Sequence, residues 1–393
     1  MAKELTHMKY TPRTTLKLLA LAIAASGFAL LGGCSKQPTT AKIGVAQPMT
    51  GSLGALGVDM LNGVKLAVEE INKEGLMVEG RAVTLEIVAV DDKANPDTGK
   101  EVAQQLVDQG VVAVIGHLNS GVSIPTAPIY AAKNIPQLAI STNPKYTELG
   151  FPTTFRLVSN DNMQAKALGQ YAVDGLRGQK IAMIDDGTPY GKGLADITVG
   201  SLKARGKEVV YRVSLDDKIV KFDAVVPKLK EAGVDLIVSM LNDFQLIPLI
   251  EQMNAAGLTE VQILGGDLIK TDKITKAGEL TKNVSATSPV LNAAEFPNGR
   301  KFIEAYRAAY KADIVYAAHY GYDATHAIAR AMRLARSVEP AEITKALRAF
   351  EVYGPVTGTN RFDKTGETTY GAVGVYAARA GQWELKFRSS DFK

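Results

Sequence analysis

The sequence predicts an α/β protein made of two lobes, each with a parallel sheet flanked by helices. The first observation is that short apolar runs alternate with longer segments whose apolar residues recur at helical spacing. The second is that this alternation starts again after residue 160, so that two similar arrays follow one another along the chain. Strands that alternate with helices form βαβ units with right-handed crossovers, and such units build parallel sheets.

The first array begins with a buried strand of sequence KIGVA at residue 42. Its apolar runs predict strands over residues 42–46, 83–90, 111–115 and 137–140. The segments between them predict helices over residues 57–71, 96–109 and 120–133. Pro96 stands at the start of the second helix, where the N–H that proline lacks would have no partner within the helix.

The second array repeats the pattern. It predicts strands over residues 180–184, 208–213, 236–240 and 262–264. Helices are predicted over residues 163–176, 191–205, 222–232 and 244–256. The segment 155–160 lies between the two arrays, and we expect it to be the first crossover from one lobe to the other.

The last hundred residues differ from both arrays. They predict helices over 300–312, 317–336 and 340–350, and then short antiparallel strands over 359–362, 372–377 and 383–387. We place these helices on the first lobe and the final strands on the second, with crossovers near Val158, Ser288 and Pro355. The predicted first lobe is therefore 41–158 with 289–354, and the second is 159–288 with 355–393.

The N-terminus carries the marks of an export signal. Basic residues come first, residues 18–31 are apolar, and Cys34 follows two glycines. The apolar run is shorter than the roughly 20 residues that span a bilayer. Leu31-Gly32-Gly33-Cys34 resembles the bacterial lipobox, which implies that 1–33 is a signal peptide and 34–40 a tether lipidated at Cys34. A plain signal peptide with an incidental cysteine is the alternative, and Met8 is a second candidate start.

The charge of the chain belongs largely to this signal. Cleavage before Cys34 leaves 393 − 33 = 360 residues and removes four basic residues and one acidic residue. The 45 basic and 41 acidic residues become 41 and 40, so the net charge falls from +4 to +1. A nearly neutral chain lacks the basic surface that nucleic-acid binding needs.

Polar side chains follow the ends of several predicted strands, where open parallel sheets hold their ligands. Ser120 lies in the exit after residue 115, where we expect it to cap the next helix, whose free N–H groups favour an anion. Thr142 follows residue 140, Tyr190 follows the strand at 180–184, and Asp267 follows the strand at 262–264. A cap, a polar turn or local packing would each explain one of these residues by itself. Together they suit a zwitterion, with carboxylate donors on one lobe and a carboxylate and an aromatic ring on the other.

Several motifs, in their order along the chain, resemble one known family. They are Gln47-Pro48-Met49-Thr50-Gly51 with Gly57, Val90-Asp91-Asp92 with Asn95-Pro96, Ile115-Gly116-His117-Leu118 through Ser120, Asp186 through Tyr190-Gly191-Lys192-Gly193, and Tyr353-Gly354-Pro355-Val356. From about residue 41 to 386 the chain is similar to the leucine/isoleucine/valine-binding (branched-chain amino acid) group of bacterial ABC-transporter substrate-binding proteins. The resemblance implies the type I periplasmic binding fold, in which two Rossmann-like lobes joined by three crossovers close on an amino acid.

The resemblance also implies roles for individual residues. Ser120 and Thr142 would bind the α-carboxylate of the ligand. The α-ammonium would meet the carbonyl of Ile140, the hydroxyl of Thr142 and the carboxylate of Asp267, although the family often has glutamate at this last position. Tyr190 would close over the ligand from the second lobe.

The expected side-chain pocket departs further from the family pattern. Leu56, Leu118 and Asn119 would face it, with Asn242 or Asp243 opposite. Aliphatic binders tend to have a small residue in place of Asn119 and an aromatic residue in place of Asn242. A buried amide without a partner costs about 1–3 kcal/mol. We therefore hypothesise a ligand with some polar reach, which a binding profile confined to aliphatic amino acids would contradict.

An enzyme is the first alternative. Only His117, His319 and His326 remain after cleavage, and no H-E-x-x-H, G-x-S-x-G or P-loop pattern occurs. Ser120 and His117 are three residues apart in one turn, which is poor geometry for a triad. The sequence therefore predicts neither catalysis nor a metal or cofactor.

A sensor of amides or other small molecules is the second alternative, because a fold does not fix a function. A receptor would need a transmembrane helix or a signalling domain, and the chain reaches Lys393 shortly after its last predicted strand. We expect an exported monomer, periplasmic or on the cell surface, that is lipid-anchored, delivers its ligand to an ABC permease and binds no nucleic acid.

Overall fold

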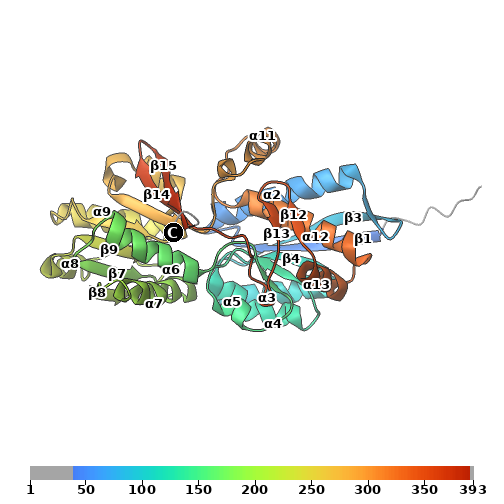
Figure 1. The fold of residues 1–393 in the computed structure, drawn as a ribbon, viewed down its shortest axis with the longest axis horizontal. Helices are drawn as coiled ribbons and strands as arrows, with labels where there is room; N and C mark the ends of the chain where they lie inside the picture. The colour runs from blue at the N-terminus through green and yellow to red at the C-terminus, as the bar shows by residue number, and fades with distance from the viewer. Residues whose placement is uncertain (1–38, 390–393) are drawn as a thin grey trace, which may run out of the picture. The chain divides into compact units, whose positions relative to one another are not determined.

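The structure, a computed structural model, describes residues 39–389. The predicted signal peptide, Cys34 and residues 35–38 of the predicted tether lie outside the described residues. The described chain forms two large sheets and a small hairpin, with helices packed around them (Figure 1). The predicted fold class, two α/β lobes with largely parallel sheets flanked by helices, is confirmed.

The first lobe is built on a six-stranded sheet. Its strands, in spatial order, are β2 (Leu76–Val78), β3 (Arg81–Asp91), β1 (Thr39–Gln47), β4 (Ala113–Gly116), β5 (Gln137–Ala139) and β6 (Thr154–Arg156). The pairs β1–β4, β4–β5 and β5–β6 are parallel, whereas β2 and β3 form an antiparallel hairpin. The helices of this array are α2 (Gly54–Glu74), α3 (Pro96–Asp108), α4 (Ser120–Ala131) and the short α5 (Lys145–Glu148).

The second lobe is built on a seven-stranded sheet. Its strands, in spatial order, are β15 (Gln382–Arg388), β14 (Gly374–Arg379), β11 (Val284–Ser288), β10 (Gln262–Gly265), β9 (Leu236–Met240), β7 (Ile181–Asp185) and β8 (Val209–Ser214). The strands from β11 to β8 are parallel, and β14 and β15 pair antiparallel at the other edge.

The helices of the second lobe surround this sheet. They are α6 (Asp161–Gln170), continued by a π-helical turn η1 (Tyr171–Gly175), then α7 (Pro189–Lys203), α8 (Val226–Ala232), α9 (Asp243–Ala255) and α10 (Asp272–Lys276). Two short 3-10 turns, η2 (Asp267–Ile269) and η3 (Gly278–Thr281), complete the array, and a third, η4 (Ala293–Glu295), follows β11 and contacts α11 (Gly299–Tyr310).

The strands predicted for the two arrays are present within a few residues of their expected bounds, but β2, β6, β11 and β12 were not predicted. The sequence of β11, VSATS, is short, and three of its five residues are serine or threonine, so it resembles a loop. All five residues are nevertheless buried, because β11 lies between β10 and β14 in the sheet. The hydroxyl of Thr287 donates to the carbonyl of Gly265 at 3.3 Å, which satisfies this polar group inside the lobe.

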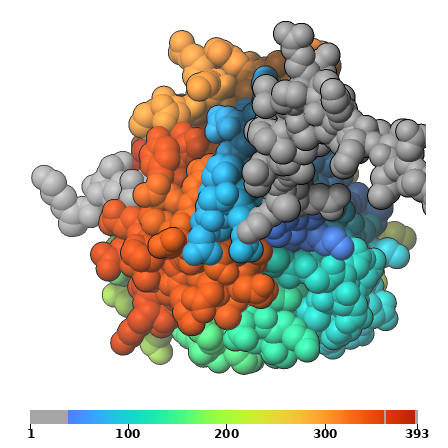
Figure 2. Space-filling view, turned by 90° about the vertical axis from the view of Figure 1, so that its right-hand side faces the viewer, coloured from blue at the N-terminus to red at the C-terminus, as the bar shows by residue number. Residues whose placement is uncertain are grey.

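The chain returns to the first lobe after β11 through α11 (Gly299–Tyr310), α12 (Ala318–Ala335) and α13 (Pro340–Ala349). Helix α12 packs along α2, and Figure 2 shows α2 in blue beside orange residues from this part of the chain. The two helices approach closely at Gly63, where a Cβ atom would lie 1.8 Å from the carbonyl oxygen of Ala318. Any larger residue at this position would push the two helices apart.

The hairpin of β12 (Val352–Gly354) and β13 (Gly358–Asn360) follows α13 and packs against α12. Its turn is held by the carboxylate of Asp323, which accepts hydrogen bonds from the backbone N–H groups of Val356 and Thr357 at 3.0 and 2.6 Å. The chain then runs past β6 and joins the second sheet at β14, well after Pro355, where we expected the last crossover.

Arg156, the last residue of β6, ties this passage to the loop after β5. The Arg156 side chain is fully buried, and its Nε atom lies 3.0 Å from Oε2 of Glu367. Its guanidinium also donates to the backbone carbonyls of Ser141 and Asn143. One cation therefore holds two segments that are distant in the sequence.

We expect Arg156→Leu to lower the free energy of unfolding by about 3 kcal/mol, because the change removes the cation that pairs with Glu367 and a donor to two carbonyl groups. Urea unfolding of the two proteins measures this loss. Arg205→Leu is the matched control, because its ion pair with Asp174 is more exposed and should contribute no more than about 1 kcal/mol. Equal small losses for both variants would contradict the argument.

Candidate functional site

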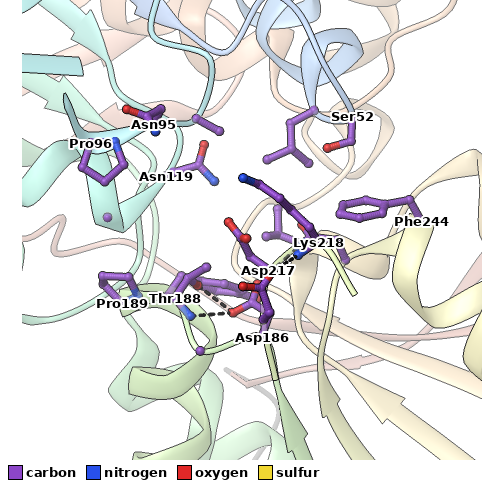
Figure 3. A pocket seen from close by; sticks show the side chains of 18 of the residues that line it. Ser52, Asn95, Pro96, Asn119, Asp186, Thr188, Pro189, Asp217, Lys218 and Phe244 are labelled. Carbon is purple, nitrogen blue, oxygen red and sulfur yellow. Dashed lines mark hydrogen bonds between the residues drawn. The ribbon is translucent and has the colours of Figure 1, made fainter. Parts of the chain in front are cut away.

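Two adjoining cavities lie between the lobes, and both are lined from both lobes. The smaller one, of about 10 Å³, is lined by Leu118, Asn119, Ser120, Ile140, Ser141, Thr142, Tyr190, Asp267, Leu268 and Tyr316. The larger one, of about 950 Å³, shares Asn119, Tyr190 and Leu268 with it (Figure 3). The residues expected around the head of an amino acid (Ser120, Ile140, Thr142, Tyr190 and Asp267) thus surround one cavity, although their roles stay predictions.

On the first lobe the wall is the start of α4 and the loop after β5. Helix α4 begins at Ser120 itself with Asn119 in the N-cap position, so the expectation that Ser120 caps the helix is wrong. The Ser120 hydroxyl instead accepts a hydrogen bond from the backbone N–H of Asn143 at 3.2 Å, which joins the two loops. The first N–H groups of a helix have no partner within the helix and attract anions. This wall therefore suits a carboxylate.

On the second lobe the wall is the buried carboxylate of Asp267. Oδ1 accepts hydrogen bonds from Nε2 of Gln164 at 3.0 Å and from the hydroxyl of Tyr190 at 2.8 Å. Oδ2 accepts from the hydroxyl of Tyr316, also at 2.8 Å. A carboxylate has about four acceptor sites, so three donors leave room for one more. Burial and the charge of Asp267 raise the pKa values of the Tyr190 and Tyr316 hydroxyls well above the ordinary value for tyrosine. Both hydroxyls therefore keep their protons and donate hydrogen bonds.

A second carboxyl group, Asp161, lies beside this site and was missed by the sequence analysis. It is the first residue of α6 and fully buried, and its backbone N–H donates to the carbonyl of Thr142 at 2.9 Å. Burial raises the pKa of Asp161 to about 7; the Thr142 hydroxyl opposes the rise, and the charge of Asp267 adds to it. Neither oxygen of Asp161 has a well-formed hydrogen bond. The signal was available, because Asp161 follows the end of β6, but we assigned that stretch to a crossover.

Hydrogen bonds bridge the lobes on both sides of the small cavity. Nδ2 of Asn143, on the first lobe, donates to the carbonyl of Pro189 at the start of α7 at 2.6 Å. The bond from Tyr316 to Asp267 also crosses, because Tyr316 precedes α12 on the first lobe. Tyr316 was likewise not predicted, since nothing near it in the sequence marks a strand exit. The described structure therefore has the two lobes in contact around the cavity.

The larger cavity has a polar wall on each side. Asn119 extends into it from the first lobe, and Asp186 and Thr188 lie on the opposite wall (Figure 3). The carboxyl group of Asp186 accepts from the N–H and the hydroxyl of Thr188 at 3.1 and 2.7 Å and from Nδ2 of Asn242 at 3.2 Å. Burial raises the pKa of Asp186 to about 6, although the bonds from Thr188 oppose the rise.

Two residues expected in the side-chain pocket lie elsewhere. Leu56 is buried in the core of the first lobe and lines neither cavity, whereas Leu53, one turn earlier, lines the larger one. Asp243 also lines neither cavity, and its carboxylate accepts from the hydroxyl of Thr271 at 2.7 Å within the second lobe. Leu118, in contrast, lines the smaller cavity.

His117 and His319 take part in hydrogen bonds within the fold. The ring of His117 lies 2.6 Å from Oδ2 of Asp92 and 3.1 Å from the hydroxyl of Tyr130. Burial lowers the pKa of His319 to about 3 and that of His326 to about 4, so both are neutral at physiological pH. Within residues 39–389, no cluster of histidine and acidic residues is placed to hold a metal ion, and no helix is long and apolar enough to cross a membrane.

Known proteins have the same fold and similar sequences. The periplasmic binding protein family matches residues 40–382. Leu/Ile/Val-binding protein homolog 2 of Brucella abortus is 35% identical over 348 residues, which cover 86% of this chain and 91% of that protein. The branched-chain amino acid transporter substrate-binding protein LivJ of Streptococcus pneumoniae, solved with isoleucine, is 26% identical with a TM-score of 0.78, over 89% of this chain and 99% of that one. A solute-binding protein of an ABC transporter from R. palustris, solved with benzoate, has the same fold at 18% identity, with a TM-score of 0.78 over 89% of this chain and 96% of that one.

Two α/β lobes with lined cavities between them are the architecture of a two-lobed binding protein. The chain belongs to the periplasmic binding protein family, in its leucine/isoleucine/valine-binding group, and the resemblance seen in the sequence is confirmed. This family consists of substrate-binding proteins of ABC transporters, not of enzymes.

The raised pKa of Asp161 predicts how stability depends on pH. Its pKa rises from 3.8 to about 7 on folding, so the folded state holds a proton that the unfolded state releases between these values. Stability of the ligand-free protein should therefore fall as pH rises from 5 to 8. Asp161→Asn removes this charge and should melt a few degrees above the parent at pH 8, but much closer to it at pH 5.

Thermal melts of both proteins at the two pH values measure this difference. Asp323→Asn is the control, because burial also raises the pKa of Asp323, to about 6, but both of its oxygens accept hydrogen bonds from the hairpin turn. An asparagine keeps only one acceptor oxygen and therefore loses part of this bonding. A difference between Asp161→Asn and the parent that is the same at pH 5 and pH 8 would show that Asp161 does not titrate in this range.

Proposed function

We propose that this chain is the exported, lipid-anchored substrate-binding protein of an ABC importer. It binds an amino acid, of branched-chain type or a more polar relative, in the cavity between its lobes and passes it to a membrane permease. The observation that carries this proposal is the small cavity itself. A helix N-terminus with hydroxyl groups forms one wall, and a carboxylate with a vacant acceptor site forms the other.

The two walls suit the two charges of an amino acid. The α-carboxylate would lie at the start of α4, against the hydroxyls of Ser120 and Thr142 and the N–H groups of the helix. The α-ammonium would lie against Asp267, with the carbonyl of Ile140 as a further acceptor. Both charges would be desolvated, and a contact between unit charges is worth about 4 kcal/mol at an effective dielectric near 20. Micromolar affinity needs only about 8 kcal/mol in total.

Binding would close the lobes without any chemical step. The three passages between the lobes, near Val158, near Ser288 and after the β12–β13 hairpin, would act as the hinge, as in other hinge-closing binding proteins. The bonds from Tyr316 to Asp267 and from Asn143 to Pro189 would form only when the lobes meet. A ligand shifts this equilibrium only by its differential affinity for the closed state. The permease would recognise that closed state.

The relatives support the choice of ligand class. The name of the Brucella protein refers to leucine, isoleucine and valine, and the Streptococcus protein was solved with isoleucine. The protein solved with benzoate shares only the fold. It shows that the fold can hold chemically different ligands, and it carries no argument about the ligand of this chain.

We expect Asp267→Asn to weaken amino-acid binding by at least about thirtyfold, because the ammonium would lose its charged partner. The measurement is a thermal-shift screen of refolded, ligand-free residues 36–393 against the twenty amino acids, followed by calorimetry on the ligands found. A ligand at 100 times its dissociation constant adds about 2.7 kcal/mol of stability.

The control is Asp323→Asn, which neutralises another buried aspartate that lines neither cavity. It should bind the same ligand as tightly as the parent, even if it unfolds more easily. Unchanged affinity in Asp267→Asn would show that the ammonium site is misassigned. A screen in which only amides or acids stabilise the parent would overturn the zwitterion and favour the sensor alternative.

The membrane anchor is tested at Cys34. In a bacterial host that processes lipoproteins, the full chain should label with palmitate and sediment with membranes. Because Cys34 is the only cysteine, a label carried on cysteine can be assigned to this residue. Cys34→Ser should remove both properties and leave the protein in the soluble fraction. An unlabelled parent protein in the soluble fraction would show that the segment is a plain signal peptide.

A further inference from the structure

We propose that the ligand is an amino acid whose side chain ends in a carboxamide, and that Asn119 and Asn242, on opposite walls of the larger cavity, select it. This inference rests on the proposed function, because it extends the ligand from the head-group site into the cavity beside it. The two cavities share Asn119 and Tyr190, so a side chain that leaves the head-group site enters the larger cavity directly.

The amide of Asn242 is fixed as an acceptor by its neighbours. Its Nδ2 atom donates to Oδ2 of Asp186 at 3.2 Å and to Oε1 of Gln245 at 3.3 Å. Gln245 is itself fixed, because its own nitrogen donates to the carbonyls of Asp216 and Ile219. Oδ1 of Asn242 is the one acceptor of the side chain, and it takes part in a capping box with the backbone N–H of Gln245 at the start of α9. This contact is not a well-formed hydrogen bond.

Asn119 meets this wall from the other lobe. It occupies the N-cap position of α4, yet its side chain makes no capping bond, and Oδ1 is buried without a hydrogen-bond partner. An N-cap asparagine normally accepts from the first turn of its helix, as Asn95 does at the start of α3. An amide that forgoes this bond and lines a cavity is free to bond to a ligand (Figure 3).

The charges around the cavity favour a neutral ligand side chain. An aliphatic group would leave the oxygens of Asn119 and Asn242 without a donor. A carboxylate would be repelled by Asp186, Asp216 and Asp217, which all line the cavity. Lys93 and Lys218 line the same cavity and oppose a cationic group. The –NH₂ group of a carboxamide has two N–H donors for the asparagine oxygens, and its carbonyl is an acceptor for Lys218, whose side chain extends across the cavity toward Asn119 (Figure 3).

The test is calorimetry of the refolded protein with glutamine, asparagine, leucine, isoleucine, valine, glutamate and lysine. Glutamine or asparagine should bind at least about tenfold tighter than any of the others. Asn119→Leu should erase this preference by weakening the amide and strengthening leucine. Asn95→Leu is the matched control, because Asn95 lines the same cavity but its oxygen is already used as a cap. It should lower stability without changing the order of ligands.

The possible results separate this inference from the proposed function. If leucine, isoleucine or valine binds tightest, or if glutamate or lysine does, the chain is an amino-acid binder but the carboxamide assignment is wrong. The assignment is equally wrong if Asn119→Leu and Asn95→Leu have the same ligand order as the parent. If no free amino acid binds, the proposed function fails and the inference fails with it.

Discussion

The carboxylate of Asp267 is held by side chains from three separate parts of the chain. Gln164 comes from α6, Tyr190 from α7, and Tyr316 from the segment that leads into α12 on the first lobe. A buried charge must be satisfied by donors or neutralised, so these elements cannot shift independently. The same bonds that stabilise the charge therefore fix the wall of the cavity, and one of them couples that wall to the opposite lobe.

On the first lobe the buried charge is the cation Arg156, which does not itself line the smaller cavity. Arg156 donates to the carbonyls of Ser141 and Asn143, and these bonds fix the loop that carries Thr142. Thr142 itself lines the smaller cavity. The guanidinium also binds Glu367, in the segment that runs toward the second sheet. A motion of that segment would therefore displace the loop that carries Thr142. Arg156 thus places a fixed charge behind the loop that carries Thr142, and Asp267 places one on the opposite wall of the smaller cavity.

The strand exits were predictable from the sequence because parallel strands present all their carboxyl ends at one edge. Once the strands before Ser120 and Thr142 were recognised, these two residues had to lie at one edge of the first sheet, and Asp267 at the corresponding edge of the second. That the two edges face each other does not follow from the strands. Tyr316 and Gln164 could not be found in this way, since each lies in a segment that reaches the site only through tertiary packing. Strand β11 was missed for a related reason, because its buried serines and threonines look polar until the neighbouring strands are known.

The site divides into a part that the fold dictates and a part that the fold leaves free. The smaller cavity lies between the first turn of α4 and the hydrogen bonds of Asp267. Substitutions in either of these parts would disturb the core of a lobe. The larger cavity is lined by helix caps and by loops such as 215–220, whose side chains can change with little effect on the sheets. One architecture can then hold isoleucine in one relative and benzoate in another protein of the same fold. Selectivity for the ligand side chain must therefore be sought at cap positions such as Asn119 and Asn242, and not in the motifs that identify the family.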